Sequence, residues 1–119
     1  MAERVAAMIH VADVRATVEW YTSIGFKVIT TYEDGEEMSF AIVGFGDGEV
    51  MFNAGGKPST RDRREVDLYV QSDDVVGLHR RLKDGVEIVE GLHDTFYGTR
   101  EFIIRDINRF WITFAQPLH

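Results

Sequence analysis

The chain of 119 residues contains no cysteine, so it has neither a disulfide framework nor a thiolate for catalysis. No apolar run reaches the roughly 20 residues that a membrane-spanning helix needs, and the first residues show no secretory signal pattern. Basic residues are scarce: 13 Lys and Arg face 20 Asp and Glu, for a net charge of −7. This balance disfavours nucleic acid and anionic membranes as partners. We therefore expect a cytoplasmic protein without nucleic-acid or membrane partners, and the charge favours cationic ligands.

The apolar content is sufficient for one packed core. Hydrophobic residues make up 45% of the chain and charged residues 28%, which is typical of a soluble globular protein. A chain of this length forms one domain in most cases. We therefore expect residues 1–119 to form a single domain.

The stretch from Asp13 to Val28 recurs, in weaker form, from Asp74 to Ile88. Each copy opens with Asp-Val, continues with apolar residues at helical spacing, and ends at a glycine followed by alternating apolar residues. A repeat at about half the chain length predicts two copies of one supersecondary unit.

Both copies carry signals for the ends of a helix. Asp13 and Asp74 are candidate N-caps, because a carboxylate there accepts a hydrogen bond from a free backbone N–H and complements the helix dipole. Gly25 and Gly85 stand where a helix commonly ends in a left-handed residue. The repeat therefore predicts one helix in each half.

Patterns of alternating and β-branched residues predict four strands around each helix. The expected strands are residues 4–11, 26–32, 38–43, 49–53, 65–71, 86–89, 97–105 and 110–115; the expected helices are 14–23 and 75–83. Residues 91–95 are expected to be a loop. The fold class is therefore α+β, with two βαβββ modules at about 1–57 and 63–119. We expect a mixed, curved sheet that forms a cup, with the helices on its outer face.

The linker between the modules carries a short charged run, Arg61-Asp62-Arg63-Arg64. Such a run can contact an anion, but it is more commonly solvated surface. We expect it to be solvated.

The repeat resembles the vicinal oxygen chelate superfamily, which includes glyoxalase I, extradiol dioxygenases, and the fosfomycin and bleomycin resistance proteins. Three segments carry the resemblance: 11–14 (Val-Ala-Asp-Val), 19–26 (Glu-Trp-Tyr-Thr-Ser-Ile-Gly-Phe) and 97–106, which contains Tyr-Gly-Thr-Arg-Glu-Phe and Arg-Asp. In place of the family's Asp-Pro-x-Gly turn, residues 106–109 read Asp-Ile-Asn-Arg. We expect the turn to form even so, because Asn tolerates turn geometry.

The resemblance implies a divalent metal held by His and Glu on strands of both modules. At three of the implied positions this chain has Ala6, Asp67 and Thr113, and the fourth falls among residues 51–53 (Met-Phe-Asn). A catalytic divalent ion with an open position needs three or more N or O ligands. We therefore expect no metal, no other cofactor and no catalytic residue. A shifted site made from His10, Glu65 and Asp67 remains an open alternative.

Without metal ligands, the cup face is expected to be an apolar, aromatic wall with a few polar points, as small-molecule sites commonly are. The candidate ligand-binding residues are Met8, His10, Phe52, Asp67, Tyr69, Trp111 and Thr113, with Phe40 and Phe96 at the border. The alternative is that these aromatic residues only fill the core.

Two functions follow from the resemblance. The nearer pattern is that of the metal-free bleomycin resistance proteins, which implies a protein that binds or sequesters a planar, cationic small molecule such as an antibiotic. The alternative is a metal-dependent lyase, isomerase, dioxygenase or thiol transferase. The resemblance also implies a homodimer. Whether the modules pair within one chain or swap between chains is left open by the sequence.

Overall fold

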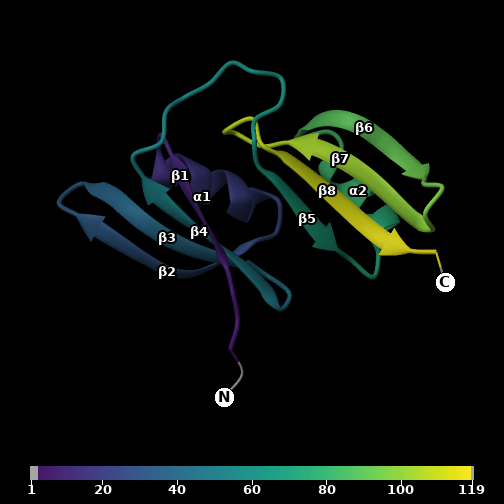
Figure 1. Cartoon of the computed structure of the whole chain (residues 1–119), viewed down its shortest axis with the longest axis horizontal. Coiled ribbons are helices and arrows are strands. Elements are labelled where there is room, and N and C mark those ends of the chain that lie inside the picture. The colour runs from purple at the N-terminus through teal and green to yellow at the C-terminus, as the bar shows by residue number, and fades with distance from the viewer. Residues whose placement is uncertain (1–2, 119) are drawn as a thin grey trace. The chain divides into compact units, whose positions relative to one another are not determined.

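The computed structural model describes residues 3–118 and consists of two compact units that divide between Ser59 and Thr60 (Figure 1). The first unit contains β1 (Ala7–Val11), α1 (Val14–Ser23), β2 (Lys27–Asp34), β3 (Glu37–Phe45) and β4 (Gly48–Ala54). The second contains β5 (Asp67–Gln71), α2 (Val75–Leu82), β6 (Glu87–Asp94), β7 (Thr99–Arg105) and β8 (Trp111–Pro117). The predicted α+β class and the βαβββ order of both units are confirmed.

Each unit has one four-stranded mixed sheet with the same topology. The strand order is β1-β4-β3-β2 in the first unit and β5-β8-β7-β6 in the second. The first strand of each unit is parallel to the last one, and the other neighbours are antiparallel. The helix between the first two strands packs on one face of its sheet, which leaves the other face without a helix.

The core of the first unit lies between α1 and the sheet. Ile9 and Val11 of β1 are buried there, as is Phe52 of β4. The Phe52 ring lies 4.9 Å from the ring of Tyr21, a fully buried residue of α1. Alternate residues of β1 therefore face the helix, and Met8 and His10 face the opposite side.

The core of the second unit is built the same way. Phe102 and Phe114 stack with ring centroids 4.9 Å apart, and Ile112 is fully buried. Val75 and Leu78 of α2 are buried as well. The residues between these on β5 and β8 therefore lie on the open face, which is the face of this sheet that α2 does not cover.

Three of the four predicted helix ends are confirmed. The Asp13 carboxylate accepts from the Ala16 N–H at 2.9 Å, and the Asp74 carboxylate accepts from the Gly77 N–H at 3.0 Å. Gly25 is left-handed, with φ of 113°. The prediction for Gly85 is wrong: it is not among the positive-φ residues, because α2 ends at Leu82 and Gly85 donates a turn hydrogen bond to the Leu82 carbonyl at 2.9 Å.

The largest difference from the predicted elements is in β6, which extends through most of the predicted loop at 91–95 to Asp94. Two register shifts between β6 and β7 interrupt its alternation, which explains why the sequence pattern ended early. β1 is shorter than predicted and begins at Ala7.

The turn at residues 106–109 forms as predicted, although the reason given for it is wrong. The Asp106 carboxylate accepts from the backbone N–H groups of Asn108 and Phe110, both at 2.8 Å. The left-handed residue is Arg109, with φ of 72°, rather than Asn108. The Asp106 side chain therefore stabilises a turn in which an arginine takes the position of the usual glycine.

Among the helices of residues 3–118, none combines the length and the apolar character that crossing a membrane requires.

Candidate functional site

The open face of the second unit carries a row of polar and aromatic residues across all four strands. In the sheet register Asp67 of β5 pairs with Trp111 of β8, Trp111 pairs with Arg105 of β7, and Arg105 pairs with Glu87 of β6. We call these four residues the first row. Arg105 donates a hydrogen bond to the Glu87 carboxylate, so one end of the row is internally neutralised.

A second row lies next to the first on the same face. Tyr69 pairs with Thr113, and Thr113 pairs with Ile103. Tyr69 is 56% exposed, which leaves much of its ring free of protein contacts. Four of the predicted site residues, in the two rows, therefore share one face of one sheet: Asp67, Tyr69, Trp111 and Thr113.

The charged segment 61–64 packs onto the first row. The carbonyl of Asp62 accepts two hydrogen bonds, from the Trp111 indole N–H at 3.1 Å and from Arg105 Nε at 2.7 Å. Arg64 places its guanidinium 4.8 Å from the centroid of the Phe110 ring. Arg61, Asp62 and Arg63 are exposed, as predicted for a solvated run, and Arg64 is half-buried. The prediction missed that the run is also bonded to the second unit on both sides of Arg63.

Arg63 contacts two of the predicted site residues at once. Its guanidinium carbon lies 4.1 Å from the centroid of the Trp111 ring, and its Nη2 donates a hydrogen bond to the Asp67 carboxylate. This hydrogen bond raises the pKa of the Arg63 guanidinium above its ordinary value. The indole face and the carboxylate therefore already hold a planar cation, which belongs to the chain itself.

The open face also holds a buried carboxylate that the sequence did not indicate. Glu101 of β7 is 3% exposed and accepts hydrogen bonds from the hydroxyl groups of Tyr97, at 2.9 Å, and Thr99, at 2.8 Å. The hydrogen bond to Glu101 raises the pKa of the Tyr97 hydroxyl, and burial adds to the effect. The sequence did contain a signal for this buried carboxylate, because two residues with hydroxyl groups, Tyr97 and Thr99, come shortly before Glu101 in the chain.

In the first unit, Met8 and His10 lie on the face that α1 does not cover. Met8 is 55% exposed. His10 Nδ1 lies 3.1 Å from the Ala54 carbonyl, to which a protonated Nδ1 donates. The backbone at Gly56 runs close beside His10. A Cβ at position 56 would lie 2.4 Å from the His10 carbonyl oxygen, so only glycine fits there. The His10 ring is therefore held against the end of β4.

Phe52 lies on the other side of the sheet from Met8 and His10. It is 0% exposed and packs against Tyr21 under α1. The positions of β4 on the same side as Met8 and His10 are Met51 and Asn53, their partners in the register. Phe52 is therefore a core residue, and we leave it out of the ligand site proposed below.

The side chains at the implied metal positions do not fit a divalent ion. Ala6 has no donor atom, Thr113 offers a neutral hydroxyl, and the Asp67 carboxylate is bonded to Arg63. Within each unit, in the part of the chain from 3 to 118, no three His, Cys, Asp or Glu side chains lie close enough together to hold a metal. In the alternative metal site made from His10, Glu65 and Asp67, both carboxylates already have arginine partners: Glu65 forms an ion pair with Arg64 at 3.5 Å, and Asp67 is bonded to Arg63.

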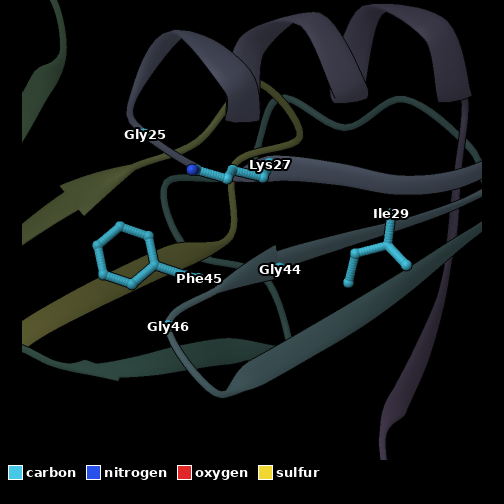
Figure 2. Close-up of a pocket in the computed structure, with 6 residues that line it drawn as sticks. All are labelled: Gly25, Lys27, Ile29, Gly44, Phe45 and Gly46. Carbon is cyan, nitrogen blue, oxygen red and sulfur yellow. The ribbon is translucent and has the colours of Figure 1, made fainter.

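A shallow apolar pocket of about 300 Å³ lies in the first unit where β2 begins and β3 ends (Figure 2). Its lining is Gly25, Lys27, Ile29, Gly44, Phe45 and Gly46. It contains none of the predicted site residues, and its one charged side chain is a lysine. A pocket without a carboxylate does not match a cationic ligand.

The family model described as the Glyoxalase/Bleomycin resistance protein/Dioxygenase superfamily matches residues 4–114. The crystal structure of TioX from Micromonospora sp. ML1 superposes with a TM-score of 0.81 at 23% identity, covering 98% of this chain and 100% of that one. The glyoxalase/bleomycin resistance protein/dioxygenase from Alicyclobacillus acidocaldarius gives 0.78 at 15% identity, covering 98% and 92%. These likenesses show the fold. No curated protein matches the chain in sequence.

Proposed function

The chain belongs to the glyoxalase/bleomycin resistance protein/dioxygenase superfamily, and we propose that it binds a planar, cationic small molecule without a metal, as a binding or sequestering protein rather than an enzyme. The proposed site is the open face of the second unit, with Asp67, Tyr69, Trp111 and Thr113 as contacts. Met8 and His10 are proposed as contacts on the equivalent face of the first unit.

One observation carries this proposal: the Asp67–Trp111 pair accommodates the planar cation of Arg63. An aromatic face attracts a cation by about 0.5–2 kcal/mol, depending on how far the site is desolvated. A hydrogen bond to a charged group is worth about 1.5–3 kcal/mol. The net charge of −7 raises the encounter rate of cations, most strongly at low salt. The same contacts that hold Arg63 therefore suit a ligand of the same chemistry.

The metal-dependent alternative has less support from the residues. Of the implied ligand positions that the sequence fixes, Asp67 alone carries a carboxylate, and that carboxylate is bonded to Arg63. An enzyme of this type would need at least two further donors from other positions.

Calorimetric titration tests the proposal, using bleomycin-type glycopeptides and planar aromatic cations such as ethidium and N-methylquinolinium. We expect at least one to bind with Kd below about 1 mM, or about −4 kcal/mol. Trp111→Ala and Asp67→Asn should each weaken binding, whereas Asp47→Asn, an equal charge change at an exposed turn of the first unit, should not. No binding to any compound, or binding that both site variants leave unchanged, would show that the open face is not the ligand site.

A further inference from the structure

The Arg63 side chain lies where the proposed ligand would bind. Its guanidinium covers the Trp111 ring at 4.1 Å and bonds to the Asp67 carboxylate. An aromatic face and a carboxylate are the two contacts that recognise a planar cation. A cationic ligand therefore has to compete with a group that the chain itself supplies.

The backbone on both sides of Arg63 is fixed to the second unit. The Asp62 carbonyl accepts from the Trp111 indole N–H at 3.1 Å, and the Arg64 backbone N–H donates to the Arg109 carbonyl at 3.3 Å. The segment consequently holds the Arg63 side chain within reach of the site at all times. Such a tether gives the guanidinium a high effective concentration at the site.

The Arg63 side chain itself is bound at the surface and is 54% exposed. Exposed ion pairs are weak, so the guanidinium can rotate into solvent without any change in the backbone. Release of the site therefore requires a change of side-chain rotamer alone.

We propose that Arg63 is an internal competitor, which fills the cation site of the ligand-free protein and leaves when a ligand binds. The inference rests on the proposed function for the nature of the ligand, but the occupancy of the site by Arg63 can be tested separately. The apparent affinity of any ligand is then its intrinsic affinity multiplied by the fraction of molecules in which Arg63 has left the site.

This competition selects ligands by size. A cation no larger than a guanidinium makes the contacts that Arg63 already makes, and it gains nothing by replacing them. Tyr69 lies on the same face of β5 as Asp67, and its ring is 56% exposed. A planar cation that covers both Trp111 and Tyr69 adds the Tyr69 ring to the contacts with Trp111 and Asp67 that hold Arg63, and so displaces it. The site therefore favours extended aromatic cations over simple amines.

Chemical rescue in the variant Arg63→Ala tests the occupancy, with methylguanidinium as the probe. The chain contains two tryptophans, so the indole N–H signal of Trp111 can be assigned by NMR with Trp20→Phe. We expect methylguanidinium to shift this signal saturably in Arg63→Ala, and to shift it neither in the wild type nor in the double variant Arg63→Ala/Asp67→Asn. Arg80→Ala makes the same charge change on the exposed surface of α2 and should behave as the wild type. Arg63→Gln provides a second variant of similar length without the charge.

The ligand arm separates this inference from the proposed function. For a planar cation that binds the wild type, Arg63→Ala should bind on the order of tenfold more tightly, and Arg80→Ala should leave the affinity unchanged. Equal affinity of both proteins, or equal shifts of the Trp111 signal by methylguanidinium, would refute the competition while leaving the proposed function intact. If methylguanidinium rescues Arg63→Ala but no aromatic cation binds either protein, the competition holds and the proposed function fails.

Discussion

The Tyr97 hydroxyl donates a 2.9 Å hydrogen bond to the Glu101 carboxylate, which is almost completely buried on the open face of the second unit. This hydrogen bond raises the pKa of Tyr97 above 10.0, and burial and the negative charge of Glu101 add to the effect. The pair therefore ties the turn before β7 to the sheet.

Replacing Glu101 with Gln should lower the pKa of Tyr97 toward 10.0, because the amide keeps an acceptor but removes the charge. NMR titration of the Tyr97 ring, assigned with Tyr97→Phe, measures this change. The control is Glu90→Gln, an exposed position of β6. An unchanged Tyr97 pKa in Glu101→Gln would show that the charge of Glu101 does not reach the hydroxyl.

The same pair predicts a loss of stability at alkaline pH. A group with a raised pKa in the folded state contributes its full stability below the unfolded pKa, here 10.0, and loses it as the pH rises through the folded pKa. The free energy of unfolding should therefore fall above pH 10.0 more steeply in the wild type than in Tyr97→Phe. Urea unfolding at pH values on both sides of 10.0 measures the difference, and parallel pH profiles would contradict the prediction.

Phe52→Ala should destabilise the protein by about 3–5 kcal/mol, because it removes a fully buried ring from the contact with Tyr21. Met8→Ala, on the other face of the same sheet, should cost clearly less than Phe52→Ala, because Met8 is 55% exposed in the single chain. Denaturant unfolding of both variants measures this. Similar losses in the two variants would contradict the assignment of Phe52 to the core and Met8 to the exposed surface.

The predicted homodimer remains a proposal. Each unit leaves one sheet face without a helix, and these faces carry large exposed side chains such as Met8 and Tyr69. Apolar surface of this kind commonly marks an interaction site. Light scattering at micromolar concentration should give twice the mass of one chain, and the mass of a single chain would rule the dimer out.

Local signals in the sequence were sufficient for most of the fold. Asp13 and Asp74 cap their helices through side-chain hydrogen bonds to residues three positions away, so a short stretch of sequence contains all the required information. Gly85 was misassigned because the end of α2 is set by a turn bond to Leu82 rather than by the glycine. The side of the sheet on which Phe52 lies could not be read, because its neighbours Val50 and Met51 are also apolar and do not alternate with it.

The candidate site depended on contacts that local patterns do not contain. Arg63 looks like part of a solvated charged run until the register of β5 and β8 places Trp111 next to Asp67. Glu101 looks like a surface residue of an alternating strand until the Tyr97 and Thr99 hydroxyls surround it. Both features arise from pairing between segments that are distant in sequence or joined by a turn, so they required the folded structure.

Calorimetric titration with and without metal distinguishes a planar cation bound by Asp67 and Trp111 alone from a metal-dependent site. The tightest-binding cation is titrated calorimetrically into protein dialysed against EDTA, and again after addition of zinc, manganese, nickel or iron(II). We predict the same Kd in every case and weaker binding in Asp67→Asn. Binding that disappears on chelation and returns with one stoichiometric metal would contradict the account and favour the metal-dependent alternative.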